Sequence, residues 1–112
     1  MKAYAELHAH SCWSLREGAS STDELIDRAT ALGYPAMALT DHDNLYGAME
    51  YARAARERGL KPITGCELTV RDNGAGRSEP DPSLPDGQPS PASHLTVLAR
   101  DVEGYRNLCR LL

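Results

Sequence analysis

The sequence predicts an α/β fold in which largely parallel strands are covered by outer helices. Short apolar stretches alternate with amphipathic stretches of helical period, and capping and stop signals bound the helical ones. Strands that are joined through helices run parallel, so this order is typical of a TIM-like βα barrel. The chain has 112 residues, whereas a complete barrel typically takes ~200 or more. We therefore expect a single domain that forms part of a barrel within a longer protein, or one that closes by self-association.

The first predicted strand and helix lie in the first third of the chain. Residues 3–8 alternate between apolar and polar side chains, as a half-buried strand does. Ser21 and Glu24 have the spacing of a capping box, and Gly33 stands where a helix would end. These signals predict a helix over residues 21–32.

A second strand, a second helix and a third strand follow. The apolar run over residues 36–39 indicates a buried strand, and residues 61–70 indicate another. Residues 45–58 have helical period, with Gly59 as the stop. Both strands are expected to run in the same direction.

The last third contains an insertion, a strand and a helix. Five of the seven prolines fall between Pro80 and Pro91, so residues 71–93 are expected to form a flexible, solvated insertion. Residues 94–100 predict a fourth strand and residues 101–112 a third helix.

Composition excludes several classes of protein. The net charge of −4 gives no basic surface of the kind that binds phosphates, so a nucleic-acid partner would have to be held by other parts of a longer protein. No apolar run reaches the ~20 residues of a membrane span, and the N terminus has no secretory signal, which favours the cytoplasm. Three cysteines without a CxxC pair argue against a disulfide framework or a zinc knuckle, and each is expected to be reduced and packed.

His8 and His10 are the first candidate metal ligands. Positions i and i+2 of a strand project to the same face, so both imidazoles can reach one cation. An isolated HxH pair is a weak signal, and two histidines at the end of a strand would look the same.

Further candidates follow the later strands. Asp41, His42 and Asp43 come directly after the second strand, although an Asp-rich turn with Asp43 or Asn44 as the cap of the next helix is the alternative. Glu67 lies within an apolar strand, where a buried carboxylate needs a partner or a metal; an edge strand with Glu67 facing water is the alternative. Glu17 is either a further ligand or an ordinary exposed glutamate.

His94 begins the predicted fourth strand. If that strand ran parallel to the others, His94 would lie at the opposite end of the sheet from the other candidates. Imidazoles mixed with carboxylates favour Zn²⁺, Mn²⁺ or Fe²⁺ over Ca²⁺, with Mg²⁺ a further candidate. Several such ligands indicate a multinuclear site, whose usual chemistry is phosphate-ester hydrolysis.

Three aromatic residues could stack on nucleic-acid bases. They are Trp13, Tyr46 and Tyr51. Aromatic rings contribute most by packing within the fold, so we expect all three to be packed.

Three long stretches of the sequence resemble the PHP (polymerase and histidinol phosphatase) domain at the N terminus of bacterial C-family DNA polymerases. They are LHAHSCWSLREGAS, ALGYPAMALTDHDNLYGAMEYARAARERGLKPITGCELTV and HLTVLARDVEGYRNLCRLL. Together they cover nearly the whole chain apart from residues 71–93. YAELHAHS, TDHD and the closing stretch are more similar to the error-prone polymerase paralogue than to the replicative alpha subunit of DNA polymerase III.

The resemblance implies a set of divalent-metal ligands and a fold. The implied ligands are His8, His10, Glu17, His42, Glu67 and His94. Glu17 stands where the family usually has aspartate. The resemblance also implies that residues 1–112 are the N-terminal portion of a distorted (βα)7 barrel, whose later strands complete a trinuclear site. The carboxylates of the polymerase site would lie in another domain of the longer protein.

The function implied is that of a PHP segment in an error-prone DNA polymerase, which contributes to damage-induced repair synthesis. Its metal site would act as a 3′-5′ exonuclease or support the fold, and DNA and other polymerase domains or repair proteins would be its partners. A free-standing PHP phosphoesterase for small phosphate esters is the alternative, and a docking module with an inert metal site is a third.

Overall fold

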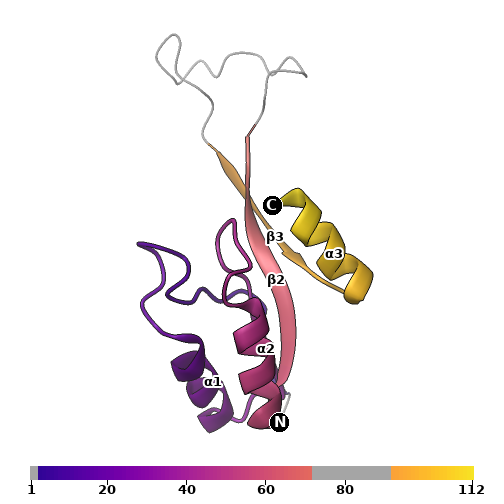
Figure 1. Ribbon diagram of the computed structural model, residues 1–112. Helices are drawn as coiled ribbons and strands as arrows, with labels where there is room; N and C mark the ends of the chain where they lie inside the picture. The colour runs from indigo at the N-terminus through magenta and orange to yellow at the C-terminus, as the bar shows by residue number, and fades with distance from the viewer. Residues whose placement is uncertain (1–2, 72–91) are drawn as a thin grey trace.

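The computed structural model describes residues 3–71 and 92–112 and confirms the α/β class (Figure 1). The predicted flexible insertion over 71–93 lies outside these residues, apart from its first residue and its last two. The elements, in chain order, are α1 (Thr22–Ala31), β1 (Ala36–Leu39), α2 (Ala48–Glu57), β2 (Lys61–Val70), β3 (Ser93–Leu98) and α3 (Val102–Leu111).

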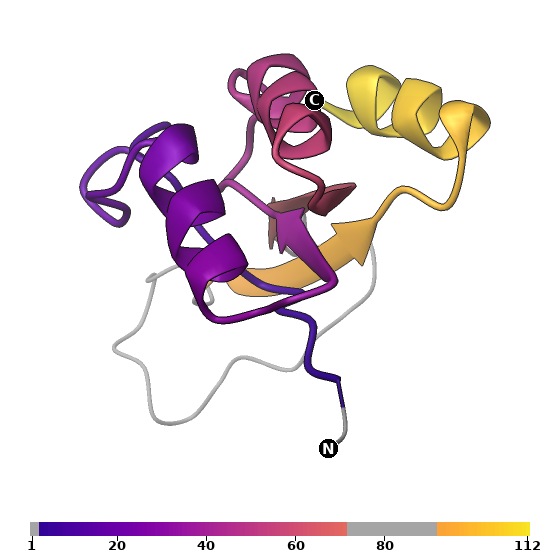
Figure 2. The same cartoon turned by 90° about the horizontal axis from the view of Figure 1, so that it is seen from below.

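The three strands form one sheet in the order β1-β2-β3. β1 and β2 are parallel, with Ala36 opposite Lys61 and Leu39 opposite Thr64, as the crossover through α2 predicts. Figure 2 shows the three helices on one side of the sheet. This is the arrangement expected for the outer helices of a barrel.

The N-terminal segment runs beside β1 but is not a full strand. Glu6 forms a single parallel bridge with Met37, and the Glu6 and Ala9 carbonyls accept hydrogen bonds from Ala38 N (2.7 Å) and Thr40 N (2.9 Å). The strand predicted over residues 3–8 is therefore reduced to one bridge. These contacts still fix the position of the chain that leads into the two histidines.

β3 runs antiparallel to β2, so the expectation of a parallel fourth strand is wrong at this position. Ser93 pairs with Val70 and His94 with Thr69. The parallel rule applies to strands that are joined through a covering helix, and the sequence between residues 71 and 92 has no helical period. As a result, β3 starts beside the end of β2.

The core lies between α1, α2 and the sheet. Tyr51 is fully buried, and its hydroxyl donates to the Met37 carbonyl at 2.6 Å. The other residues of the core cluster are Ile26, Ala29, Met37, Leu39, Ala54, Ala55 and Leu60. α3 is attached more loosely, because Leu108 is its one buried residue. In the described part of the chain, no helix has both the length and the apolar character that a membrane span requires.

The helix ends follow the local signals in the sequence. Ser21 and Glu24 form the predicted capping box, with bonds of 2.8 Å from Ser21 N to Glu24 Oε2 and 3.2 Å from Glu24 N to Ser21 Oγ. α2 begins at Ala48, three residues later than predicted, because a turn precedes it. In that turn Asn44 Oδ1 accepts from Tyr46 N at 3.1 Å.

The cysteines differ in exposure, and this difference can be tested. Cys66 is fully buried as expected, whereas Cys12 and Cys109 are exposed and correct the expectation that all three pack. Burial also raises the pKa of the Cys66 thiol. We expect DTNB to modify Cys12 and Cys109 quickly. Cys66 should react at least ~100-fold more slowly, since a core strand must first open. In guanidinium all three should react alike, and three fast thiols in the native chain would contradict the burial of Cys66.

Candidate metal centre

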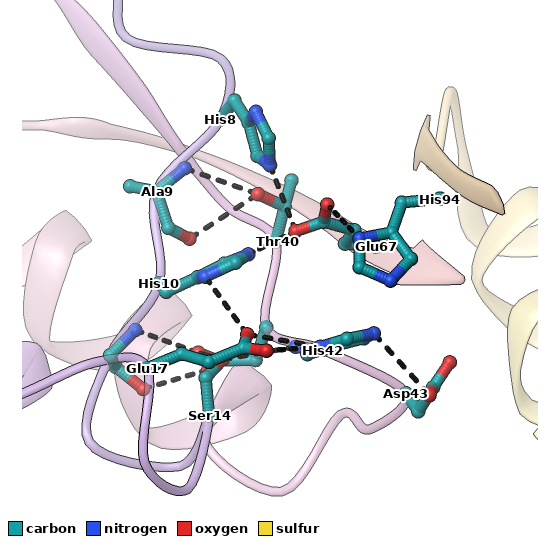
Figure 3. Close-up of polar contacts among 12 residues, drawn as sticks. His8, Ala9, His10, Ser14, Glu17, Thr40, His42, Asp43, Glu67 and His94 are labelled. Atoms are coloured by element: carbon teal, nitrogen blue, oxygen red, sulfur yellow. Dashed lines mark hydrogen bonds and ion pairs between the residues drawn. The ribbon is translucent and has the colours of Figure 1, made fainter. Parts of the chain in front are cut away.

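Six predicted ligands converge at one end of the sheet (Figure 3). Each comes from a segment that the fold places there. His8 and His10 follow the bridge to β1, Glu17 lies in the next loop, and His42 follows β1. The remaining two are Glu67 in β2 and His94 at the start of β3.

Glu67 is the centre of this cluster. The residue is only 7% exposed, and β2 is the middle strand, so the alternative of an edge strand with Glu67 facing water is wrong. Its Oε2 lies 3.0 Å from His8 Nε2 and in contact with His10 Nε2, while its Oε1 lies 3.3 Å from His94 Nδ1. The hydrogen bond with His8 lowers the pKa of Glu67 and outweighs burial, which raises it. The carboxylate is therefore ionised at neutral pH.

His10 has a buried ring nitrogen that faces Glu67. Its Nε2 is in ion-pair contact with Glu67 Oε2. One donor atom from each of His8, His10 and Glu67 lies within 4.8 Å of the others. Imidazole nitrogens and a carboxylate at this spacing suit one divalent cation, so the residues present fit a metal ion.

A second pair lies next to the first group. His42 Nδ1 is 2.9 Å from both oxygens of Glu17, and this hydrogen bond raises the pKa of His42. His42 Nε2 lies 2.7 Å from Thr69 Oγ1. His10 connects the two groups, because its Nδ1 is 3.5 Å from Glu17 Oε2. Although Glu17 is partly exposed, it points toward the imidazoles, which separates it from an ordinary surface glutamate.

His94 lies with the other candidates, contrary to the expectation that it would occupy the opposite end of the sheet. The antiparallel pairing of β3 brings its first residues beside the end of β2. The rings of His94 and His42 pack edge to face with centroids 4.6 Å apart. Because β3 is antiparallel and not parallel to β2, His94 lies at the same end of the sheet as the other candidates.

Asp41 has a role that the sequence does not reveal directly. The residue is 2% exposed and accepts three hydrogen bonds of 2.7 Å, from Ser11 N, Ser11 Oγ and Ser14 Oγ. It thereby ties the loop that contains His10 and Glu17 to the end of β1. The only available signal was the two serines three residues apart in that loop.

Asp43 also contacts the sheet instead of capping α2. Its carboxylate accepts from Thr69 N at 2.6 Å and from Thr69 Oγ1 at 2.5 Å. Burial raises the pKa of Asp43, but the hydrogen bonds from Thr69 and the neighbouring His42 together lower it by more. The net shift of the pKa is therefore downward. Asp43 therefore holds the loop after β1 against β2, with its own backbone at a left-handed φ of 53°.

The family of the chain follows from its match to known domains. The PHP domain family matches residues 6–112, which include all six converging residues. The chain belongs to the PHP domain family. This confirms the resemblance found in the sequence.

Relatives of this PHP chain include bacterial DNA polymerases. The error-prone DNA polymerase of Mycobacterium tuberculosis (strain ATCC 25618 / H37Rv) is 50% identical over 111 residues, which cover 98% of this chain and 9% of that protein. The DNA polymerase III subunit alpha of Chlamydia trachomatis is 41% identical over 105 residues, which cover 94% and 8%. The PHP chain thus spans less than a tenth of the length of these relatives.

A solved structure supports the fold of the PHP chain. An amidohydrolase from Chromobacterium violaceum, which holds sulfate and no metal, superimposes with a TM-score of 0.65 at 29% identity. The superposition covers 96% of this chain and 33% of that one. The sheet and helices described above therefore correspond to part of a larger fold, as the barrel interpretation requires.

Proposed function

We propose that the chain is the PHP segment of an error-prone DNA polymerase and that its histidine–glutamate cluster binds divalent cations that support 3′-5′ cleavage of DNA. The observation that carries this proposal is the position of Glu67. Its two oxygens face imidazoles on opposite sides, His8 and His10 toward Oε2 and His94 toward Oε1. A carboxylate flanked in this way would provide oxygen ligands for divalent cations beside the imidazole nitrogens.

The six residues divide into two groups of ligands under this proposal. His8, His10 and Glu67 would hold one ion, since their donor atoms already lie together. Glu17, His42 and His94 would serve a neighbouring ion. Zn²⁺, Mn²⁺ and Fe²⁺ match the mixture of nitrogen and oxygen donors, and Mg²⁺ is a further candidate.

A bound cation would supply the chemistry of phosphodiester hydrolysis, by lowering the pKa of a water and by neutralising charge on phosphate oxygens. The residues of the chain contribute the geometry. Asp41 and Asp43 fix the two loops, and the ionised Glu67 supplies the negative charge that attracts a cation. His8 and His94 are about half exposed, so the cluster is open to a polymeric substrate.

The polymerase activity would belong to other parts of a longer polypeptide. Damage-induced repair synthesis would be the process, the cytoplasm its location, and DNA with neighbouring polymerase domains or repair proteins the partners. The likeness to error-prone polymerases supports the polymerase part of this proposal. The intact mass of the native polypeptide in the source cell tests this part of the proposal. A mass many times 12.2 kDa is expected, and a native chain that ends near Leu112 would contradict it.

The metal-dependent part is tested by calorimetry and by hydrolysis. Metal-free chain is titrated with Zn²⁺ and Mn²⁺, and the loaded chain is then given a 5′-labelled single-stranded oligodeoxynucleotide or, in parallel, p-nitrophenyl phosphate. We expect saturable metal binding and stepwise shortening of the oligonucleotide. Binding without cleavage would favour a supporting role for the metal, and cleavage of the monoester alone would favour the small-ester phosphoesterase. Absence of metal binding would overturn the metal site.

A further inference from the structure

Two aromatic side chains are exposed beside the metal centre. Tyr51 is fully buried, as expected for all three aromatic candidates, but Trp13 is 40% exposed and Tyr46 is 77% exposed. Their ring centroids are 6.2 Å apart, with the planes at 67°. The expectation that they are packed is therefore wrong for Tyr46 and only partly correct for Trp13. Packing in the core does not explain why these two aromatic rings lie at this place.

The two rings border a hollow that includes a residue of the metal centre. Its volume is about 270 Å³, and its lining residues are Trp13, Leu15, His42, Asp43, Asn44 and Tyr46. This volume lies just below the ~300–1,000 Å³ typical of small-molecule sites. The hollow is therefore suited to one flat ring system, with His42 connecting it to the cluster of imidazoles.

Asn44 holds both aromatic residues in place. It is 8% exposed, and its Nδ2 donates to the Trp13 carbonyl at 3.1 Å and to the His42 carbonyl at 2.9 Å. Its Oδ1 accepts from Tyr46 N at 3.1 Å. One buried amide thus fixes the backbone of both aromatic residues relative to His42.

The indole of Trp13 rests directly on the backbone of Gly47. A Cβ atom at Gly47 would lie 2.5 Å from Trp13 Cδ1, which is too close for any larger residue without a shift of the ring. Trp13 N also donates to Ser11 Oγ at 3.2 Å. Although Trp13 is exposed, its position is fixed from several sides, as a preorganised binding surface requires.

We propose that Trp13 and Tyr46 form a stacking site for a nucleobase of the DNA strand whose phosphate reaches the metal centre, an inference that rests on the proposed function. Aromatic rings bind the face of any base, so the site would take single-stranded DNA without sequence preference. Asp43 in the lining disfavours a phosphate in the hollow itself. The base therefore occupies the hollow, and the backbone lies toward the imidazoles.

The experiment uses the intrinsic fluorescence of the chain, because Trp13 is its single tryptophan. In the presence of Mn²⁺ the chain is titrated with a short single-stranded oligothymidylate, and with a strand that has the same number of phosphates but abasic sugars. We expect the oligothymidylate to quench Trp13 and to bind more tightly than the abasic strand. Tyr46→Leu should weaken oligothymidylate binding about fivefold to a hundredfold, the usual effect of losing one stacked ring, and leave abasic binding unchanged.

A second variant and a matched control complete the test. Trp13→Leu, followed by the anisotropy of a dye-labelled strand, should show a similar loss. Tyr4→Leu changes an exposed tyrosine whose ring packs edge to face against Tyr34, and this variant should bind like wild type. Calorimetry should give the same metal affinity for all variants. Equal binding of the two strands by a chain that binds metal would overturn the stacking site alone, and a chain that binds no metal would overturn the proposed function.

Discussion

Replacing Glu67 by glutamine is expected to reduce the affinity of the chain for Zn²⁺ or Mn²⁺ by more than 100-fold. The variant keeps the size of the side chain but removes the charge that faces His8, His10 and His94. Loss of a partner outside the ligand set already costs ~10–100-fold in metal affinity, so the loss of a proposed ligand should cost more. Calorimetric titration of metal-free protein, together with the metal content of purified samples, measures the effect.

Glu57→Gln is the matched control for this substitution. Glu57 is exposed and forms a surface ion pair of 2.8 Å with Arg53 on α2, so its loss should leave metal affinity within error of wild type. Circular dichroism should show that both variants retain the fold. Equal metal affinity of Glu67→Gln and Glu57→Gln would remove Glu67 from the ligand set, and with it the main support for the proposed function.

Replacing Asp41 by alanine is expected to destabilise the metal-free chain by roughly 3 kcal/mol or more. Three donors on Ser11 and Ser14 would lose their acceptor, and each unsatisfied buried polar group costs ~1–3 kcal/mol. Urea unfolding of the metal-free chain gives the change in the free energy of unfolding. Metal affinity should fall as well, because His10 and Glu17 lie in the loop that Asp41 holds.

Two further variants separate the role of Asp41 from a general effect of charge. Asp27→Ala removes an exposed carboxylate that pairs with Arg58 at 3.0 Å, and such pairs contribute ~0–1 kcal/mol. Asp41→Asn keeps the shape and one acceptor oxygen, so we expect a stability between those of wild type and Asp41→Ala. If Asp41→Ala unfolded at the same urea concentration as Asp27→Ala, the anchoring role would be disproved.

The sequence was sufficient for most elements because their signals are local. The capping box at Ser21, the apolar run of β1 and the helical period of α2 each depend on neighbouring residues alone. The direction of β3 depends instead on its pairing with β2, a tertiary contact that the residues of β3 alone do not specify. The strand predicted over residues 3–8 is too long, because that segment forms one bridge only, at Glu6.

The same distinction applies to the metal centre. Spacing alone indicated His8 and His10, and an acidic residue in an apolar strand indicated Glu67. Their meeting with His94 followed from strand pairing, and the anchoring role of Asp41 followed from tertiary contacts with Ser11 and Ser14. The arrangement of Trp13 and Tyr46 around Asn44 is likewise a consequence of two loops that are distant in sequence.

The separation of the clustered residues along the chain has a consequence for folding. His8 and Glu67 are 59 positions apart, and His94 comes later still. An unfolded chain holds no equivalent group of donors, so a cation that binds there selects the folded state and adds RT ln(1 + [M]/Kd) to its stability, about 2.7 kcal/mol when the free ion is at 100 times Kd. A chelator that removed the cation would lower the free energy of unfolding by the same amount.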